Sequence, residues 1–243
     1  MNHSRRINTF IGAMLLASAI TAGYAIFVSH ALHAYLAVAV LALATATSRM
    51  RVKLPGINGN MSVNLPFLLT AVVNLSAVEA VVITSVSTVM QCWPRQNAKF
   101  NRQQMTFNVS MMAFASCLAS LVLHADRSGI EWNSTFGLTL ATATLFLGQT
   151  APVAAIVAVS EGKATGPLWW SLAHLSFPYY VLSAGVTSMV HTASSHLGWG
   201  LALAVFPVMY GIHRSYKLYF GQMAEALMNP LPQQSVKAAS AGT

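Results

Sequence analysis

Charged residues are scarce in this 243-residue chain. They make up 7% of the sequence and only five are acidic, whereas charged residues form roughly 25% of an ordinary soluble domain. Hydrophobic residues account for 55%. A chain with so little charge and so much apolar side chain is not an ordinary soluble domain, and its expected partner is a lipid bilayer.

Cysteine is also scarce, with two residues, Cys92 and Cys117. Both fall in or beside apolar segments, and their spacing fits no metal-binding motif. Two cysteines provide no disulfide framework either. We interpret both as small packing residues.

Catalytic and nucleotide-binding motifs are missing. The sequence has no GxSxG elbow, no HExxH, no paired-carboxylate site and no nucleotide-binding loop. The net charge of +8 comes from basic residues that stand singly or in small groups between apolar runs, a pattern that reflects membrane topology rather than a nucleic-acid-binding patch. We predict a protein that is not an enzyme, uses no cofactor and binds no nucleic acid.

What the sequence does contain is a series of apolar runs. Several approach or exceed the about 20 residues that a helix needs to cross a bilayer. The expected fold is an all-α, polytopic transmembrane helical bundle over residues 1–213, with about eight helical segments. Their expected bounds are 9–28, 32–47, 65–75, 78–93, 104–124, 133–159, 168–190 and 197–213.

The organising stretch is a short helical hairpin at 64–93. Turns at Gly56 and Gly59 precede it, and Asn64 is a predicted helix cap, followed by a proline in the first turn. The helix that ends near Leu75 is about 16 Å long, too short for a hydrocarbon core of about 30 Å. Two arrangements fit: a re-entrant hairpin, or two thin spans held inside the bundle.

The basic residues predict the orientation of the chain in the membrane. With Arg5 in the cytoplasm the loops alternate, and every lysine and arginine except Arg127 then falls on the cytoplasmic side. Both termini are therefore expected in the cytoplasm. Beyond the bundle, we expect a cytoplasmic or interfacial helix at 214–228 and a disordered tail at 229–243.

Polar side chains within or at the ends of the apolar segments are the candidate functional residues. They are costly in lipid, so they should face the bundle interior, pair with one another or line a cavity. The predicted site is a small ligand pocket near the hairpin. Its candidate residues are Asn64, Asn74, Glu79, Asn108, Gln149 and His174. Glu79 has a simpler interpretation, because a carboxylate in the first turn of a helix also serves as a cap.

Three prolines, Pro152, Pro178 and Pro207, lie within the later apolar segments. Each removes a backbone hydrogen bond and bends its helix. Three bent helices in succession fit a site or a moving part, and they equally fit ordinary membrane helices, in which proline is common.

Histidines are concentrated at the predicted outer ends of the segments. The candidates for an outward-facing metal or pH-sensing role are His30, His33, His191 and His196. No carboxylate-rich ligand motif accompanies them, so we predict no metal site.

The stretch from Gly59 to Gln91, followed by KFNRQQMTFNVSMMAFAS, resembles the multi-pass N-terminal membrane sensor regions of bacterial GGDEF and HD-GYP signalling proteins. The resemblance rests on Gly59 and Ser62, on the Glu79-Ala80 pair and on Phe107-Asn108, and it extends from about residue 31 to 213. It implies a sensory role in a bacterial cytoplasmic (inner) membrane. It also places Gln149 at a polar position of a later helix. Since no cyclase or phosphodiesterase sequence follows Met228, output is expected from a partner protein.

Two hypotheses follow for function. The first is an integral membrane sensory or signalling module that binds a small ligand or a partner protein within its bundle. The alternative is a small-molecule transport component similar in outline to the substrate-binding S components of vitamin importers. Both require the lipid bilayer and a signalling or transport partner in trans, and both are compatible with a homo-oligomer.

Overall fold

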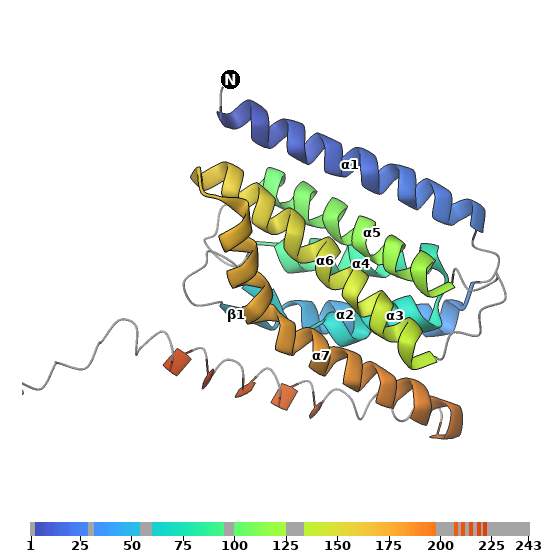
Figure 1. Ribbon diagram of the computed structural model, residues 1–243. Helices are drawn as coiled ribbons and strands as arrows, with labels where there is room; N and C mark the ends of the chain where they lie inside the picture. Colours follow the sequence, from blue (N-terminus) through green and yellow to red (C-terminus); the bar gives the residue numbers. More distant parts are fainter. Residues whose placement is uncertain are drawn as a thin grey trace, which may run out of the picture.

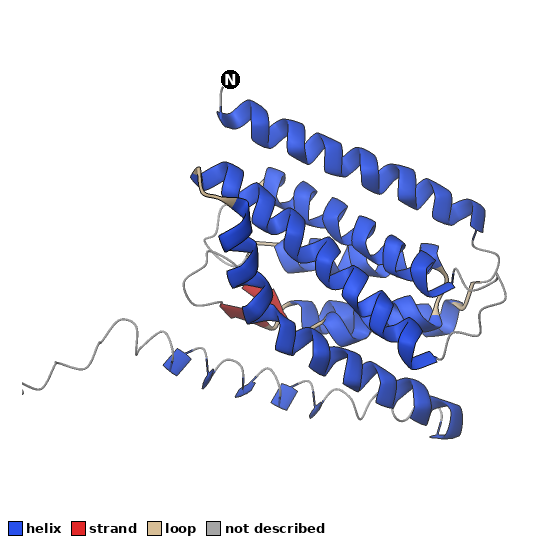
Figure 2. Cartoon of the chain, in the orientation of Figure 1, coloured by secondary structure: helices blue, strands red, loops and turns tan. Residues whose placement is uncertain are grey.

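The computed structural model describes residues 3–28, 32–53, 60–94, 100–124 and 134–197, and scattered positions between 207 and 222. Within these residues the regular secondary structure is helical, apart from two short paired strands (Figures 1 and 2). The elements are α1 (His3–Val28), α2 (Ala34–Ser48), β1 (Arg51–Lys53), β2 (Asn60–Ser62), α3 (Leu65–Asn74), α4 (Ala77–Cys92), α5 (Arg102–His124), α6 (Ser134–Glu161) and α7 (Thr165–Leu197).

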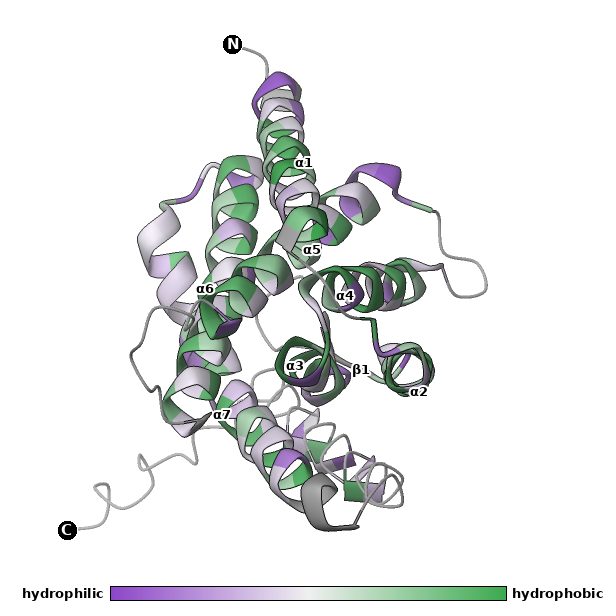
Figure 3. Cartoon of the chain, turned by 90° about the vertical axis from the view of Figure 1, so that its right-hand side faces the viewer, coloured by the Kyte–Doolittle hydropathy of each residue, from purple (hydrophilic) through white to green (hydrophobic). Residues whose placement is uncertain are grey.

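Three of the described helices are long and apolar enough to cross a membrane. They correspond to Arg5–Phe27 in α1, Arg102–His124 in α5 and Thr135–Glu161 in α6. The helices α2, α3 and α4 are apolar but shorter. Many large apolar residues are exposed on the bundle, as expected for a surface in contact with lipid, and Figure 3 shows how hydrophobic residues are distributed along the helices. The fold is therefore that of an all-helical membrane protein.

The described residues contain seven helices rather than the predicted eight. The seventh, α7, continues past the predicted end at residue 190 to Leu197. Most of the predicted eighth segment, 197–213, lies outside the described residues, as does the tail at 229–243. The described positions between 207 and 222 are helical and exposed, Pro207 among them.

A two-stranded antiparallel ribbon precedes the helical hairpin, where the sequence predicted turns alone. Strands β1 and β2 pair Arg51 with Ser62 and Lys53 with Asn60. Strands of three residues are too short to produce a detectable alternation of apolar and polar residues. The connection between them, which includes Gly56 and Gly59, lies outside the described residues.

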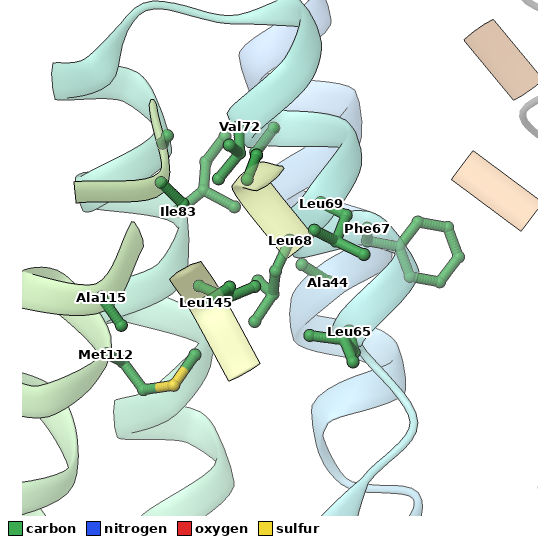
Figure 4. Packing of buried hydrophobic residues seen from close by; sticks show 14 of the residues in the cluster. Ala44, Leu65, Phe67, Leu68, Leu69, Val72, Ile83, Met112, Ala115 and Leu145 are labelled. Atoms are coloured by element: carbon green, nitrogen blue, oxygen red, sulfur yellow. The ribbon is translucent and has the colours of Figure 1, made fainter. Parts of the chain in front are cut away.

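The α3–α4 hairpin lies in the core of the bundle. Helix α3 packs against α2, α5 and α7, and α4 packs against α2 and α5. Helix α1 lies along one edge, against α5 (Figure 1). Buried side chains from all seven described helices form one cluster, and Figure 4 shows part of it around the hairpin. The labelled members of this cluster are Ala44, Leu65, Phe67, Leu68, Leu69, Val72, Ile83, Met112, Ala115 and Leu145.

The ends of the two hairpin helices follow from local sequence. A proline stands in the first turn of α3, where its missing N–H costs no helical bond. At the end of α3, Leu75 turns to an extended conformation, and Ser76 caps α4. The prediction that Asn64 caps α3 with its side chain is wrong, because the side chain makes no such bond. Its amide instead donates to Ser87 of α4.

Candidate functional site

Glu79 is held at the start of α4 by a reciprocal capping arrangement. The backbone N–H and the hydroxyl of Ser76 donate to Glu79 Oε2 at 3.0 and 2.8 Å, and the Glu79 N–H donates back to Ser76 Oγ at 3.3 Å. The backbone N–H of His33 donates to Glu79 Oε1 at 2.6 Å. Oε2 is therefore used within the hairpin turn, and Oε1 joins that turn to the start of α2.

Buried polar contacts also hold the two arms of the hairpin to their neighbours. Asn64 Nδ2 donates to Ser87 Oγ at 3.0 Å, which joins the start of α3 to the later part of α4. The hydroxyls of Thr84 on α4 and Ser116 on α5 lie 2.8 Å apart. A buried hydrogen bond between helices replaces contacts that water would otherwise provide, so these pairs fix the position of the hairpin.

Helix α7 contacts α3 at both ends of α3. The Leu65 N–H donates to the Tyr179 phenol oxygen at 3.3 Å, and Thr187 donates to the carbonyl oxygen of Pro66 at 3.2 Å. At the other end of α3, Asn74 Oδ1 lies 2.8 Å from Nδ1 of His191. These contacts place α7 against the full length of α3.

Helix α7 is also connected to α6, through Gln149. The Tyr180 phenol donates to Gln149 Oε1 at 2.6 Å, and the Nε2 atom of the same amide is buried without a hydrogen-bond partner among the described residues. The ring of Phe146 packs edge-on against Tyr180, with 5.0 Å between the ring centres. Trp169 Nε1 donates to Thr150 at 3.2 Å, one residue beyond Gln149.

The six residues predicted to line one pocket are distributed over several sites. Asn108 on α5 donates to Cys92 Sγ at 3.4 Å, and His174 is exposed on α7. Asn74 pairs with His191, whereas Gln149 pairs with Tyr180. The structure brings each of five candidates to a partner on another element instead of gathering all six.

The two described prolines inside helices are Pro152 of α6 and Pro178 of α7. Pro178 directly precedes Tyr179 and Tyr180. These two tyrosines hold α7 to α3 and to α6 respectively. The proline position thus coincides with the point at which α7 contacts both neighbours.

No group of three or more histidine, cysteine, aspartate or glutamate side chains that could hold a metal ion occurs in the described part of the chain. His33 contributes its backbone N–H to Glu79, and His191 pairs with Asn74. His30 lies outside the described residues, and so does the side chain of His196.

Sequence reasoning missed Ser87, Tyr179, Tyr180 and Thr187 as contact residues. A serine or threonine hydroxyl within an apolar helix commonly bonds to its own backbone, so nothing in the local pattern distinguishes Ser87 and Thr187. One signal was available, since Tyr179 and Tyr180 directly follow a helical proline.

Comparison with protein families, with curated proteins and with solved structures finds no match to this chain. Functional interpretation therefore rests on the geometry described above.

Proposed function

We propose that this chain is a multi-pass membrane sensory module, in which the helical bundle binds a small ligand or a partner protein and α7 carries the resulting shift toward the C-terminal segment. The supporting observation is the set of polar contacts that α7 makes on either side of Pro178. Before the proline, Trp169 donates to Thr150 of α6. After it, Tyr180 contacts α6, whereas Thr187 and His191 contact α3.

This arrangement suits α7 to the role of a lever. Pro178 has no N–H and removes one backbone hydrogen bond from the helix, so bending is easiest there. Helix α7 has 33 residues, which corresponds to about 50 Å. A small displacement of α6 relative to α3 would therefore rotate a long helix about its contacts with both, and a hinge of this kind is one established form of conformational switch.

The resemblance to bacterial sensor regions supports the same proposal. In those bacterial proteins the sensor region precedes a signalling enzyme. Here we propose that α7 and the segment after it act on such an enzyme in trans, at a bacterial cytoplasmic membrane with both termini on the cytoplasmic side.

The test is a capture experiment in mild detergent with three chains, followed by mass spectrometry of bound proteins. One chain is intact, one lacks 216–243, and the matched control keeps that segment with its residue order scrambled. We expect the intact chain alone to retain a signalling enzyme. Capture of an ATPase with a coupling protein would instead identify a transport component, and equal capture by all three chains would contradict a role for the C-terminal segment.

A further inference from the structure

One polar group in the bundle interior lacks a partner. Gln149 accepts a hydrogen bond from Tyr180 through Oε1, whereas its Nε2 is buried and donates to nothing among the described residues. Turning the amide over would let the nitrogen donate to the phenol oxygen, but it would then leave Oε1 and the phenolic hydrogen without partners. Either orientation leaves the Gln149–Tyr180 pair incompletely satisfied.

An acceptor that completes this donor would have to reach well into the membrane. A buried donor without an acceptor destabilises the folded state, so native proteins rarely keep one that no ligand, water or ion completes. Along α6, Gln149 lies about 18 Å from Glu161 at 1.5 Å per residue. That distance places the amide deep in a hydrocarbon core of about 30 Å, where bulk water is absent.

Aromatic rings pack beside Tyr180, the hydrogen-bond partner of this amide. Phe146 packs edge-on against Tyr180 and also against Phe177, with 6.1 Å between the latter ring centres. Phe177 exposes 58% of its surface. Gln149 as a whole is only partly buried, although its Nε2 atom is buried. A ligand from the bilayer therefore reaches the amide nitrogen only when the side chains that cover it move aside.

We propose that Gln149 and Tyr180 bind the carbonyl oxygen of an apolar, ring-bearing molecule dissolved in the bilayer, of the quinone type. Gln149 Nε2 donates to the carbonyl oxygen, Tyr180 holds the amide in the orientation that presents this donor, and the ligand ring packs against Phe146 and Phe177. Ester carbonyls of phospholipids lie at the edge of the hydrocarbon region, so the depth of Gln149 favours a molecule that enters the core. This inference rests on the proposed sensory function and names the ligand class.

The test uses the full chain in nanodiscs of ether-linked phospholipid, which has no ester carbonyl, with decylubiquinone labelled with ¹³C at its carbonyls. A hydrogen bond lowers the carbonyl stretching frequency, so we expect a shifted infrared band that saturates with quinone. Replacing the amide with a side chain of similar length, Gln149→Met, should weaken binding about tenfold or more and remove the shifted band.

Two further variants separate loss of the donor from general damage. Thr144→Val on the same helix removes a hydroxyl that bonds only to the Leu140 carbonyl at 2.8 Å, and it should bind quinone like the unmodified chain. Tyr180→Phe should reduce affinity by a smaller factor, because it leaves the donor in place. Gln149→Met removes one unsatisfied donor but also the acceptor of the buried Tyr180 hydroxyl, so its thermal unfolding should stay close to that of the unmodified chain.

The outcomes are decisive in both directions. No saturable shift with decylubiquinone, or the same shift in Gln149→Met, overturns the proposal. A carbonyl band whose shift depends on Gln149 but appears only in nanodiscs of ester-linked phospholipid would identify the phospholipid carbonyl as the ligand. That outcome overturns the quinone class. The capture experiment does not depend on quinone, so the sensory proposal can fail while this site stands, and the reverse also holds.

Discussion

Helix α1 and the α3–α4 hairpin are both apolar, yet they occupy opposite environments. Helix α1 is long enough to cross a bilayer, and only 11% of its apolar window is buried within the bundle. Helix α3 has ten residues, of which seven are buried. Helix α1 lies at the edge of the bundle, whereas the hairpin lies in the core (Figure 1).

Hydrophobicity does not explain this difference, because lipid tails are as apolar as leucine. The two regions differ instead in the hydrogen-bond partners of their polar side chains. In α1 the hydroxyls of Thr9 and Ser18 bond to carbonyls of their own helix, and the contact of Asn8 with Gln103 of α5 is exposed. In the hairpin, Asn64, Thr84 and Glu79 bond to other segments of the chain. A membrane helix joins the core when its polar groups find partners on its neighbours.

The largest expected effect comes from truncating a core leucine. Leu69→Ala, at a position with 0% exposure, should lower the free energy of unfolding by about 2–5 kcal/mol because it leaves a cavity. The matched change Leu16→Ala in α1, where the side chain is 63% exposed, should leave it nearly unchanged. Unfolding by sodium dodecyl sulfate in mixed micelles measures both, and equal losses would show that α1 is packed as tightly as the hairpin.

A glycine comparison should give a smaller effect. A Cβ at Gly148 of α6 would lie 2.8 Å from Ala115 Cβ and 3.2 Å from its Cα on α5, whereas a Cβ at Gly12 of α1 meets nothing within 4 Å. Gly148→Ala should therefore force α5 and α6 apart and cost about 1–3 kcal/mol. Gly12→Ala should cost nothing in the same micelle titration. A neutral Gly148→Ala would contradict the close approach of these two helices.

The third comparison concerns two carboxylates. Glu79→Gln should cost about 1–2 kcal/mol, because an amide has one acceptor oxygen where the carboxylate uses two against Ser76 and His33. Glu161→Gln at the end of α6 removes a partly exposed ion pair with Lys163 and should change stability by less than about 1 kcal/mol. Thermal unfolding of the two variants in detergent measures both costs. A larger loss of stability for Glu161→Gln than for Glu79→Gln would contradict the structural role of Glu79.

Much of the helical layout was predictable from the sequence. Glycine, proline and charged residues interrupt the apolar runs, so the hairpin expected at 64–93 appears as α3 and α4 with bounds that agree closely. The Ser76-x-x-Glu79 spacing carries the signature of a capping box. Local sequence was sufficient here because each of these features involves residues within a few positions of one another.

The partners of the candidate residues were not predictable in this way. Asn64 bonds to a residue 23 positions away, His33 to one 46 away and Thr187 to one 121 away. Such contacts depend on which helices become neighbours, and periodicity within one helix does not determine that. Asn64 illustrates the failure, since it fits a cap by residue type and instead bonds across to α4.

The contact between Thr187 and the Pro66 carbonyl has a consequence for biosynthesis. As the chain leaves the ribosome, α3 enters the membrane environment long before α7 exists, and a helix of ten residues cannot span on its own. The hairpin therefore has to wait, incompletely enclosed, until translation has passed residue 187. During that interval the face of α3 that α7 later covers is open to insertion chaperones and membrane proteases.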